Sequence, residues 1–417
     1  MQQKYSAGQA PYQLDESGRL LDRARRVDAS FLRQPGVIGS RSGEGAVPVF
    51  ADRAEGPYVW DADGNRYVDF VLGFGAVVLG HAHPAVTDAV CAQLTRGVSP
   101  TLHSPLQVDL AELLVSVIPG AEMALLLKTG SDATDLAVRL ARAHTGRPRV
   151  LRWGYHGWHD WCAPRNAGLA PGAHDHVESF RYDDLAGLAR LMSGCQGEVA
   201  CVIMMPLETE PPAPGYLEGV RALAHQHGAI FVLDEVRSGF RLALGGAQEY
   251  FGVRADLVAL SKAMANGHPI SALVGRRDIL RTTALISASS LSFRSSDGIA
   301  AALATIRSIM ARNVVGILWE RGRQLIAGLR SGAGRQEIPV NVVGLPPMPF
   351  QHFGYRSVLR QRSAEEVFYA ETRRRGVLFH PAHPWFTCAA MSADDIALAV
   401  DAAEAGYAAI RRAVGTA

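Results

Sequence analysis

Lysine is almost missing from this sequence of 417 residues. Of its 42 basic side chains only Lys4, Lys128 and Lys262 are lysines, so the other 39 are arginines. Arginine keeps its proton and cannot form a Schiff base, whereas a desolvated lysine can lose its proton and form one. We therefore interpret Lys262, which follows a short apolar run, as the amine that carries a carbonyl cofactor. The alternative is a surface lysine at a strand end.

Other missing features exclude several classes of protein. The net charge is +2 and no apolar run approaches the length of a bilayer span, so neither a nucleic acid nor a membrane is an expected partner. The five cysteines are scattered, without a C-x-x-C pair, so we predict neither a disulfide framework nor a metal site. The first residues contain no apolar signal region, and we predict a cytoplasmic location. Neither G-x-G-x-x-G after a strand nor a Walker A motif is present, which argues against a nicotinamide cofactor or a nucleoside triphosphate.

The chain is long enough for one large domain and one smaller domain. Between about residues 120 and 275, short apolar runs alternate with amphipathic stretches. This alternation predicts an α/β fold, with a mainly parallel central sheet that has helices on both faces. We expect an N-terminal segment (1–60) that packs with the small domain, a large domain (61–310), and a small α+β domain (311–417).

One stretch, residues 230–264, brings two polar groups to the ends of two predicted strands. The apolar run 230–233 stops at Asp234, and the run 256–260 leads into Ser261 and Lys262. Polar groups at the carboxyl ends of parallel strands line the ligand crevice of such a sheet. A carboxylate and an amine are therefore expected at neighbouring strand ends.

Two further stretches fit the same crevice. Gly130, Ser131 and Asp132 lie between a predicted strand and a helix, where free N–H groups bind anions, although Gly-Ser-Asp is also an ordinary helix cap. Tyr155 lies in an aromatic loop (154–161) that could stack on a planar ring or simply pack the core. A phosphate, a flat ring, a ring nitrogen and an aldehyde are together the features of pyridoxal 5'-phosphate.

At this point the chain resembles the class III aminotransferases, which are fold-type-I pyridoxal-phosphate transferases. It is most similar to the subgroup around glutamate-1-semialdehyde aminomutase and to sugar-modifying aminotransferases of polysaccharide and aminoglycoside pathways. The resemblance is carried by segments 55–65, 80–84, 129–132, 154–161, 214–218, 234–241 and 261–267.

The resemblance implies roles for single residues. Lys262 matches the Schiff-base lysine and proton-transfer base, and Asp234 matches the partner of the pyridinium nitrogen. Tyr155 matches the ring-stacking aromatic. Gly130 and Ser131 match the phosphate turn.

Three positions depart from the family pattern or match it weakly. Asp132 stands where relatives usually have Glu, Glu210 falls near a position close to the cofactor hydroxyl, and Met205 replaces the usual Glu of a Glu-Pro pair.

A homodimer with active sites at the interface is also implied by the resemblance. In relatives, a threonine reaches the partner subunit's phosphate. Leu291 takes that position here, so Ser290 or Ser292 replaces the threonine or the contact is lost.

The leading hypothesis is an aminotransferase that moves nitrogen from an amino-acid donor to a ketone or aldehyde acceptor. The loop 380–386 is rich in His and Trp, and no arginine follows it until Arg411, so no guanidinium is placed there to bind an acceptor carboxylate. We expect His383, Trp385 and His156 to contact the substrate. The predicted acceptor is a sugar or aminocyclitol, as in aminoglycoside antibiotic biosynthesis.

Two other functions remain open. The same lysine could serve an isomerase, either an amine epimerase or an aminomutase, and Cys91, Tyr155, His156 and Glu210 cannot be ranked as its second acid or base. A cofactor-binding regulator without catalysis is the non-enzymatic alternative, and the presence of Lys262 argues against it.

Overall fold

The computed structural model describes residues 12–32 and 50–416, which fall into two compact units. Unit 1 contains residues 12–32, 50–74, 80–82 and 319–416, and unit 2 contains residues 75–79 and 83–318. Residues 61–74 and 80–82, expected in the large domain, lie in unit 1, and residues 311–318, expected in the small domain, lie in unit 2. Part of the expected N-terminal segment, residues 1–11 and 33–49, lies outside the described residues.

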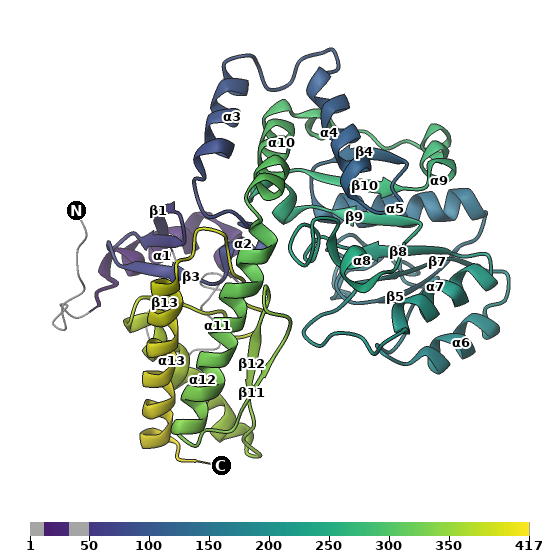
Figure 1. Cartoon of the computed structure of the whole chain (residues 1–417). Coiled ribbons are helices and arrows are strands. Elements are labelled where there is room, and N and C mark those ends of the chain that lie inside the picture. The colour runs from purple at the N-terminus through teal and green to yellow at the C-terminus, as the bar shows by residue number, and fades with distance from the viewer. Residues whose placement is uncertain (1–11, 33–49, 417) are drawn as a thin grey trace. The chain divides into compact units, whose positions relative to one another are not determined.

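The described part of unit 2 is built on a seven-stranded sheet with the order β4-β10-β9-β8-β7-β5-β6 (Figure 1). The pairs from β9 to β6 are parallel, and β10 runs antiparallel to both of its neighbours. A mainly parallel sheet was predicted, but the antiparallel strand was not. The strands are β4 (Met123–Leu127), β5 (Arg149–Trp153), β6 (Val177–Ser179), β7 (Val199–Met204), β8 (Ile230–Asp234), β9 (Leu257–Leu260) and β10 (Ser271–Gly275).

Helices cover the sheet because its central strands are apolar on both sides. Every residue of β7 and β8 is buried, and successive residues of a strand point to opposite faces, so both faces are covered. The helices that begin in unit 2 are α3 (Pro84–Leu94), α4 (Pro105–Val117), α5 (Gly130–Thr145), α6 (Leu185–Gly194), α7 (Tyr216–Gln226), α8 (Gly246–Phe251), α9 (Arg277–Arg281), α10 (Ser296–Ala311) and α11 (Val314–Arg335), with short 3-10 helices at η2 (Lys262–Ala265), η3 (Thr282–Leu285) and η4 (Leu291–Arg294).

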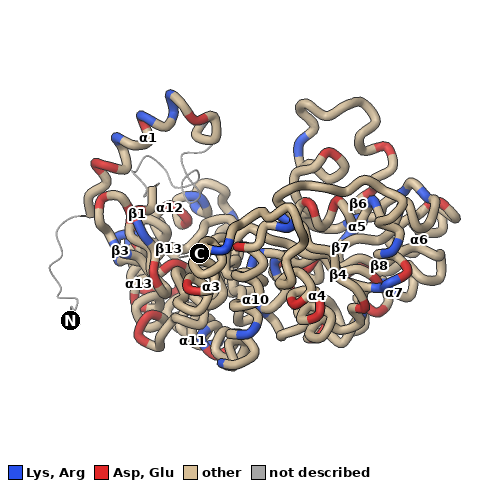
Figure 2. The backbone as a smooth tube through the Cα atoms, turned by 90° about the horizontal axis from the view of Figure 1, so that it is seen from above, with Lys and Arg blue, Asp and Glu red and all other residues tan. Residues whose placement is uncertain are grey.

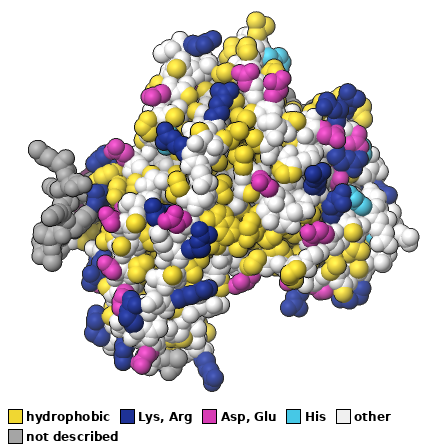
Figure 3. Space-filling view, in the orientation of Figure 1, with side chains coloured by type: hydrophobic (Ala, Val, Ile, Leu, Met, Phe, Trp, Pro, Cys, Tyr) yellow, Lys and Arg dark blue, Asp and Glu magenta, His cyan; other side chains and the backbone are white. Residues whose placement is uncertain are grey.

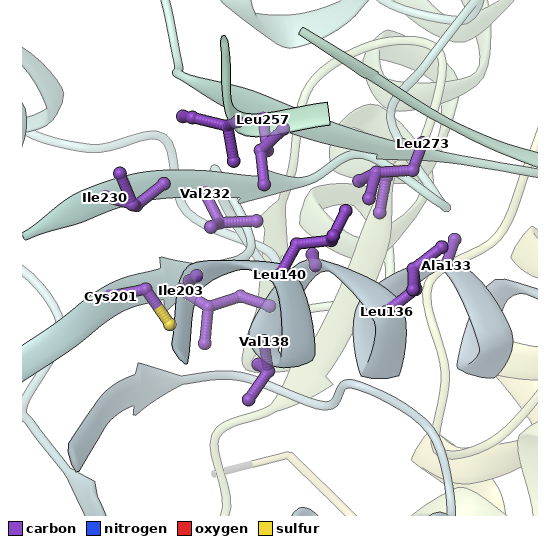
Figure 4. Packing of buried hydrophobic residues seen from close by; sticks show 14 of the residues in the cluster. Ala133, Leu136, Val138, Leu140, Cys201, Ile203, Ile230, Val232, Leu257 and Leu273 are labelled. Atoms are coloured by element: carbon purple, nitrogen blue, oxygen red, sulfur yellow. The ribbon is translucent and has the colours of Figure 1, made fainter. Parts of the chain in front are cut away.

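The core of unit 2 forms where α5 packs on the sheet (Figure 4). Leu140 of α5 lies close to Val232, and Leu136, one helical turn earlier, lies on the side of Leu273. This packing sets the start of α5 at the carboxyl edge of the sheet, next to the ends of β8 and β9.

Unit 1 combines small sheets with long helices, as the predicted α+β composition requires. The meander β1-β2-β3 is extended by β13, which pairs in parallel with β3 although the two lie about 300 residues apart in the chain. That pairing draws residues 66–69 into unit 1. The elements are α1 (Asp15–Val27), η1 (Ala29–Leu32), β1 (Ala51–Glu55), β2 (Tyr58–Asp61), β3 (Arg66–Asp69), α2 (Leu72–Gly75), β11 (Val340–Val343), β12 (Phe350–Phe353), α12 (Val358–Arg374), β13 (Val377–Leu378) and α13 (Ala393–Ala413).

Charges of both signs are interspersed along the backbone (Figure 2) and on the face seen in Figure 3. Within residues 12–32 and 50–416, no single helix is both long and apolar enough to cross a membrane. Helices α10 and α11 meet the length and composition criteria only as a pair, and that pair is bent by 72°. No group of three or more His, Cys, Asp or Glu residues that could hold a metal ion occurs among the described residues.

Candidate active site

The ends of β8 and β9 lie side by side and carry the two residues that the sequence singled out. Asp234 is in register with Ala259, and the Glu235 N–H donates to the Ala259 carbonyl at 3.0 Å. Three residues after Ala259, Lys262 begins the short helix η2. The carboxylate therefore ends β8, and the amine follows the end of the adjacent parallel strand β9, which agrees with the expected neighbouring strand ends.

Asp234 is buried, with 5% of its surface exposed, and both of its oxygens have partners. Oδ2 forms a 2.8 Å hydrogen bond with His156 Nδ1, and Oδ1 accepts the Val236 N–H at 3.1 Å. The His156 side chain has no exposed surface, and its ring stacks on Trp161 with centroids 5.9 Å apart. The predicted substrate role of His156 is corrected: its ring holds Asp234 from within the protein.

Lys262 has a perturbed environment and an unusual backbone. Its φ of 48° lies in the left-handed region, which costs energy for a residue with a side chain. Burial, and then the positive charge of Arg237, lower the pKa of its amine to about 8, while the charge of Asp234 acts in the opposite direction. A larger fraction of this amine is therefore neutral near pH 7 than for an ordinary lysine.

The first turn of α5 is fixed by a capping box. Thr129 caps the helix by accepting the Asp132 N–H at 3.1 Å, and the Asp132 carboxylate accepts the Thr129 N–H at 2.7 Å. Asp132 thus stabilises the turn with its carboxylate, while Gly130 and Ser131 occupy the first turn, where N–H groups have no helical partner. A side chain at Gly130 would come within 2.8 Å of Val236 Cγ1, so only glycine lets this turn lie against the end of β8.

The aromatic loop after β5 lies against that turn. Gly157 has a φ of +108°, and a Cβ there would meet Ser131, 2.8 Å from its Cβ and closer still to its hydroxyl. The Thr134 hydroxyl donates to the His156 carbonyl at 2.6 Å, which ties the loop to α5. The loop and the first turn of α5 are therefore positioned together.

Tyr155 is 63% exposed at this loop, and burial of the remainder raises the pKa of its hydroxyl. Its main-chain N–H donates to Met205 Sδ at 3.3 Å. A side chain at Gly154 would approach the same sulfur to 2.7 Å. Met205, which replaces the usual glutamate, thus fills the space under the turn that presents Tyr155.

The remaining predicted cofactor residues are exposed. Glu210 lies in the loop after β7, and its carbonyl accepts the Tyr182 hydroxyl at 3.3 Å. Ser290 caps η4 by accepting the Ser292 N–H at 3.3 Å, and both serines lie on the surface of unit 2. Their contact with a partner subunit stays a prediction.

Trp385 and His383 belong to unit 1. Trp385 has no exposed surface, stacks on Phe379 with centroids 4.0 Å apart, and donates its Nε1–H to the His380 carbonyl at 2.8 Å. The prediction that Trp385 contacts the substrate is therefore corrected, since its ring fills the core. His383 is partly exposed and lies edge-on to Phe74, with ring centroids 5.0 Å apart.

Two charged residues next to Asp234 were missed from the sequence. Glu235 is buried and accepts the Gln248 N–H at 2.9 Å at the start of α8, and burial raises the pKa of its carboxyl to about 7. Arg237 is also buried, and it binds the main chain after β7. Only their proximity to Asp234 in the sequence could have indicated them.

Comparison with known proteins identifies the family. The model of the aminotransferase class-III family matches residues 40–394. The chain is 36% identical to a 3-aminobutyryl-CoA aminotransferase of Cloacimonas acidaminovorans, over 92% of this chain and 96% of that protein. It is also 36% identical to a glutamate-1-semialdehyde 2,1-aminomutase of Syntrophobacter fumaroxidans, over 93% of this chain and 96% of that protein.

Solved structures agree with this assignment. The FumI protein of Sphingopyxis sp. MTA144, in its pyridoxal-phosphate internal aldimine form, superposes with a TM-score of 0.89 and 30% identity, covering 95% of this chain and 96% of that one. An omega-transaminase from Sphaerobacter thermophilus gives a TM-score of 0.85 with 26% identity, over 95% of this chain and 98% of that one. The chain belongs to the class III aminotransferase family. It is an enzyme of the fold-type-I class whose cofactor is pyridoxal phosphate.

Proposed function

We propose that the carboxyl edge of the unit 2 sheet holds pyridoxal phosphate between Asp234, Lys262, Tyr155 and the start of α5. The donors and charges present fit the group. Gly130 and Ser131 offer N–H groups and a hydroxyl to a phosphate, Tyr155 offers an exposed ring, and Asp234 offers a buried carboxylate to a pyridinium N–H. The observation that carries the proposal is the pairing of this buried carboxylate with a lysine of lowered pKa at adjacent strand ends.

The bound cofactor supplies an electron sink that stabilises negative charge on the carbon next to the reacting nitrogen. The protein supplies proton transfer and orientation. Lys262 Nζ is the group that takes a proton from that carbon and returns one, because an amine with a pKa of about 8 exchanges protons readily near neutral pH. His156 holds the Asp234 carboxylate in a fixed direction through their 2.8 Å bond.

The reaction we propose is transfer of an amino group from an amino-acid donor to a ketone or aldehyde. The full-length similarity to a protein named as an aminotransferase supports this reaction. A sugar or aminocyclitol acceptor, in an aminoglycoside pathway, has less support now that Trp385 lies in the core of unit 1. His383 is partly exposed, and its role in substrate binding stays a prediction.

An aminomutase is the second candidate function. It is favoured by the 36% identity to a glutamate-1-semialdehyde 2,1-aminomutase over 93% of this chain. Both reactions use the same lysine, but a mutase returns nitrogen to the same carbon skeleton and needs no separate acceptor. The two functions are therefore separated by their products.

We also propose a homodimer in which the loop with Ser290 and Ser292 approaches the partner's phosphate site. The exposed serines, and Leu291 between them with 74% of its surface exposed, support an interface at this loop. Light scattering of the purified protein tests the dimer. Loss of phosphate-group affinity in a Ser290→Ala, Ser292→Ala double variant tests the contact.

The cofactor site is tested by borohydride reduction and peptide mapping. The label is expected on Lys262, and Lys262→Ala should show neither the label nor the visible absorbance of the bound cofactor. Lys128→Ala is the matched control and should retain both. A label at another residue would refute the assignment.

The reaction is tested by adding single amines to the purified protein and following the visible absorbance. Keto acids, and oxidised amino sugars, are then supplied as acceptors. Formation of a new amine from either panel supports an aminotransferase and identifies its acceptor class. Conversion of glutamate-1-semialdehyde without any acceptor would instead establish the mutase.

A further inference from the structure

Arg237 is a buried cation at the carboxyl edge of the unit 2 sheet. It lies three residues after Asp234, and only 9% of its surface is exposed. Its Nη2 donates to the main-chain carbonyls of Leu207 and Glu208, each at 2.8 Å. These bonds anchor the guanidinium against the loop that follows β7.

The charge of Arg237 is not paired within the described residues. No carboxylate in residues 12–32 and 50–416 lies within 4.0 Å of the guanidinium, and its Nε is buried without a hydrogen-bond partner in that part of the chain. Burial lowers the pKa of this group, and the more distant charges of Glu208 and Asp234 only partly oppose the effect. Because a buried cation is costly unless an anion joins it, the remaining donors point to an anionic ligand.

The position of Arg237 indicates that its anionic ligand is a different group from a phosphate bound at the start of α5. The preceding side chain, Val236, lies at the phosphate turn, since a Cβ on Gly130 would touch it. Arg237 instead binds the loop after β7. Arg237 follows the end of β8, and the adjacent strand β9 leads into Lys262. The positive charge of Arg237 also contributes to the lowered pKa of the Lys262 amine.

We propose that Arg237 binds the carboxylate of the amino-acid substrate beside the amine of Lys262. This inference rests on the proposed function, since an amino-acid donor brings a carboxylate close to the reacting nitrogen. The planar guanidinium donates charge-assisted hydrogen bonds to the carboxylate oxygens. Arg237, which follows β8, thus supplies the guanidinium for a substrate carboxylate that the loop 380–386 lacks.

Arg237→Gln tests this assignment by comparing L-alanine with ethylamine, which lacks only the carboxylate. The rate of reaction with the holoenzyme is measured against amine concentration for both. Losing a charge-assisted bond should lower the preference for L-alanine over ethylamine by about 10- to 100-fold. Arg237→Lys should recover part of that preference because it keeps the charge without the planar fork. Arg221→Gln, an exposed position on α7, is the matched control and should keep the parent preference.

A binding measurement gives a readout that is independent of turnover. Saturation-transfer NMR of the holoenzyme with propionate, which has no amine to react, should show binding that Arg237→Gln abolishes. Propionamide should bind both proteins equally. An unchanged preference for L-alanine over ethylamine in Arg237→Gln would overturn the inference. An equal loss of rate with both amines, together with a shifted pH dependence of the cofactor absorbance, would also overturn it and would place the guanidinium on the cofactor. Failure of the proposed function is distinct, since the parent protein would then lack the visible absorbance and the label at Lys262.

Discussion

Replacing Gly157 by alanine tests whether the aromatic loop positions the phosphate turn. Gly157 has a φ of +108°, and the added Cβ would lie 2.8 Å from Ser131 Cβ and closer to its hydroxyl. Gly97 has a similar φ of +97° but open space around it, so Gly97→Ala carries the same kind of backbone strain without the collision. The strain costs about 1–3 kcal/mol in each variant. Overpacking adds about 1–3 kcal/mol in Gly157→Ala alone.

The measurements are the dissociation constant of pyridoxal phosphate from the apoprotein and the thermal midpoint of each variant. Both variants should be less stable than the parent. If Ser131 must move, only Gly157→Ala should bind the cofactor more weakly, by about 10- to 100-fold. Equal cofactor affinity in the two variants would show that Ser131 does not contribute to the phosphate site, and the reasoning from the turn would fail.

Three further predictions concern the carboxylate, the amine and the core of unit 1. His156→Phe leaves an oxygen of Asp234 without its donor and should cost about 1–3 kcal/mol in cofactor binding. His156→Asn should recover part of that binding energy. Equal loss in both variants would contradict the hydrogen-bonding role. The rate of cofactor uptake by the apoprotein, measured by stopped flow, should rise with pH and reach half its maximum near pH 8. Burial and the charge of Arg237 favour loss of the proton from Lys262. A midpoint near pH 10 would show that the amine behaves as an ordinary exposed lysine. Trp385→Ala should lower the stability of the protein by about 3–5 kcal/mol, measured by denaturation, and leave the choice of acceptor unchanged.

Local sequence patterns were sufficient where the chemistry depends on where a strand ends. The apolar runs before Asp234 and Lys262 each form a strand buried on both faces. One strand ends at Asp234, and the other ends at Leu260, two residues before Lys262. The glycine at 130 begins α5, and its neighbour Ser131 follows it in the first turn. These features are set by residues adjacent in the chain, so periodicity and capping rules can find them.

Side-chain partners were beyond those rules. His156 and Trp385 both look like ligand-facing residues in loops, yet both side chains have no exposed surface, and each hydrogen-bonds within its own unit. Whether an aromatic or imidazole ring faces solvent depends on elements that pack against it from elsewhere in the chain. Arg237 was missed for the same reason, since its carbonyl partners follow a different strand.

The sequence by itself determined the α/β class, the family, the cofactor, and the order of polar groups along the strand ends. The tertiary structure decided that β10 runs antiparallel and that β13 joins β3 across most of the chain. It also decided that His156 binds the Asp234 carboxylate and that Arg237 is buried against the loop after β7. The physical reason is that strand formation and capping follow from neighbouring residues. Pairing and burial follow from contacts between distant ones, which form only when the whole unit packs.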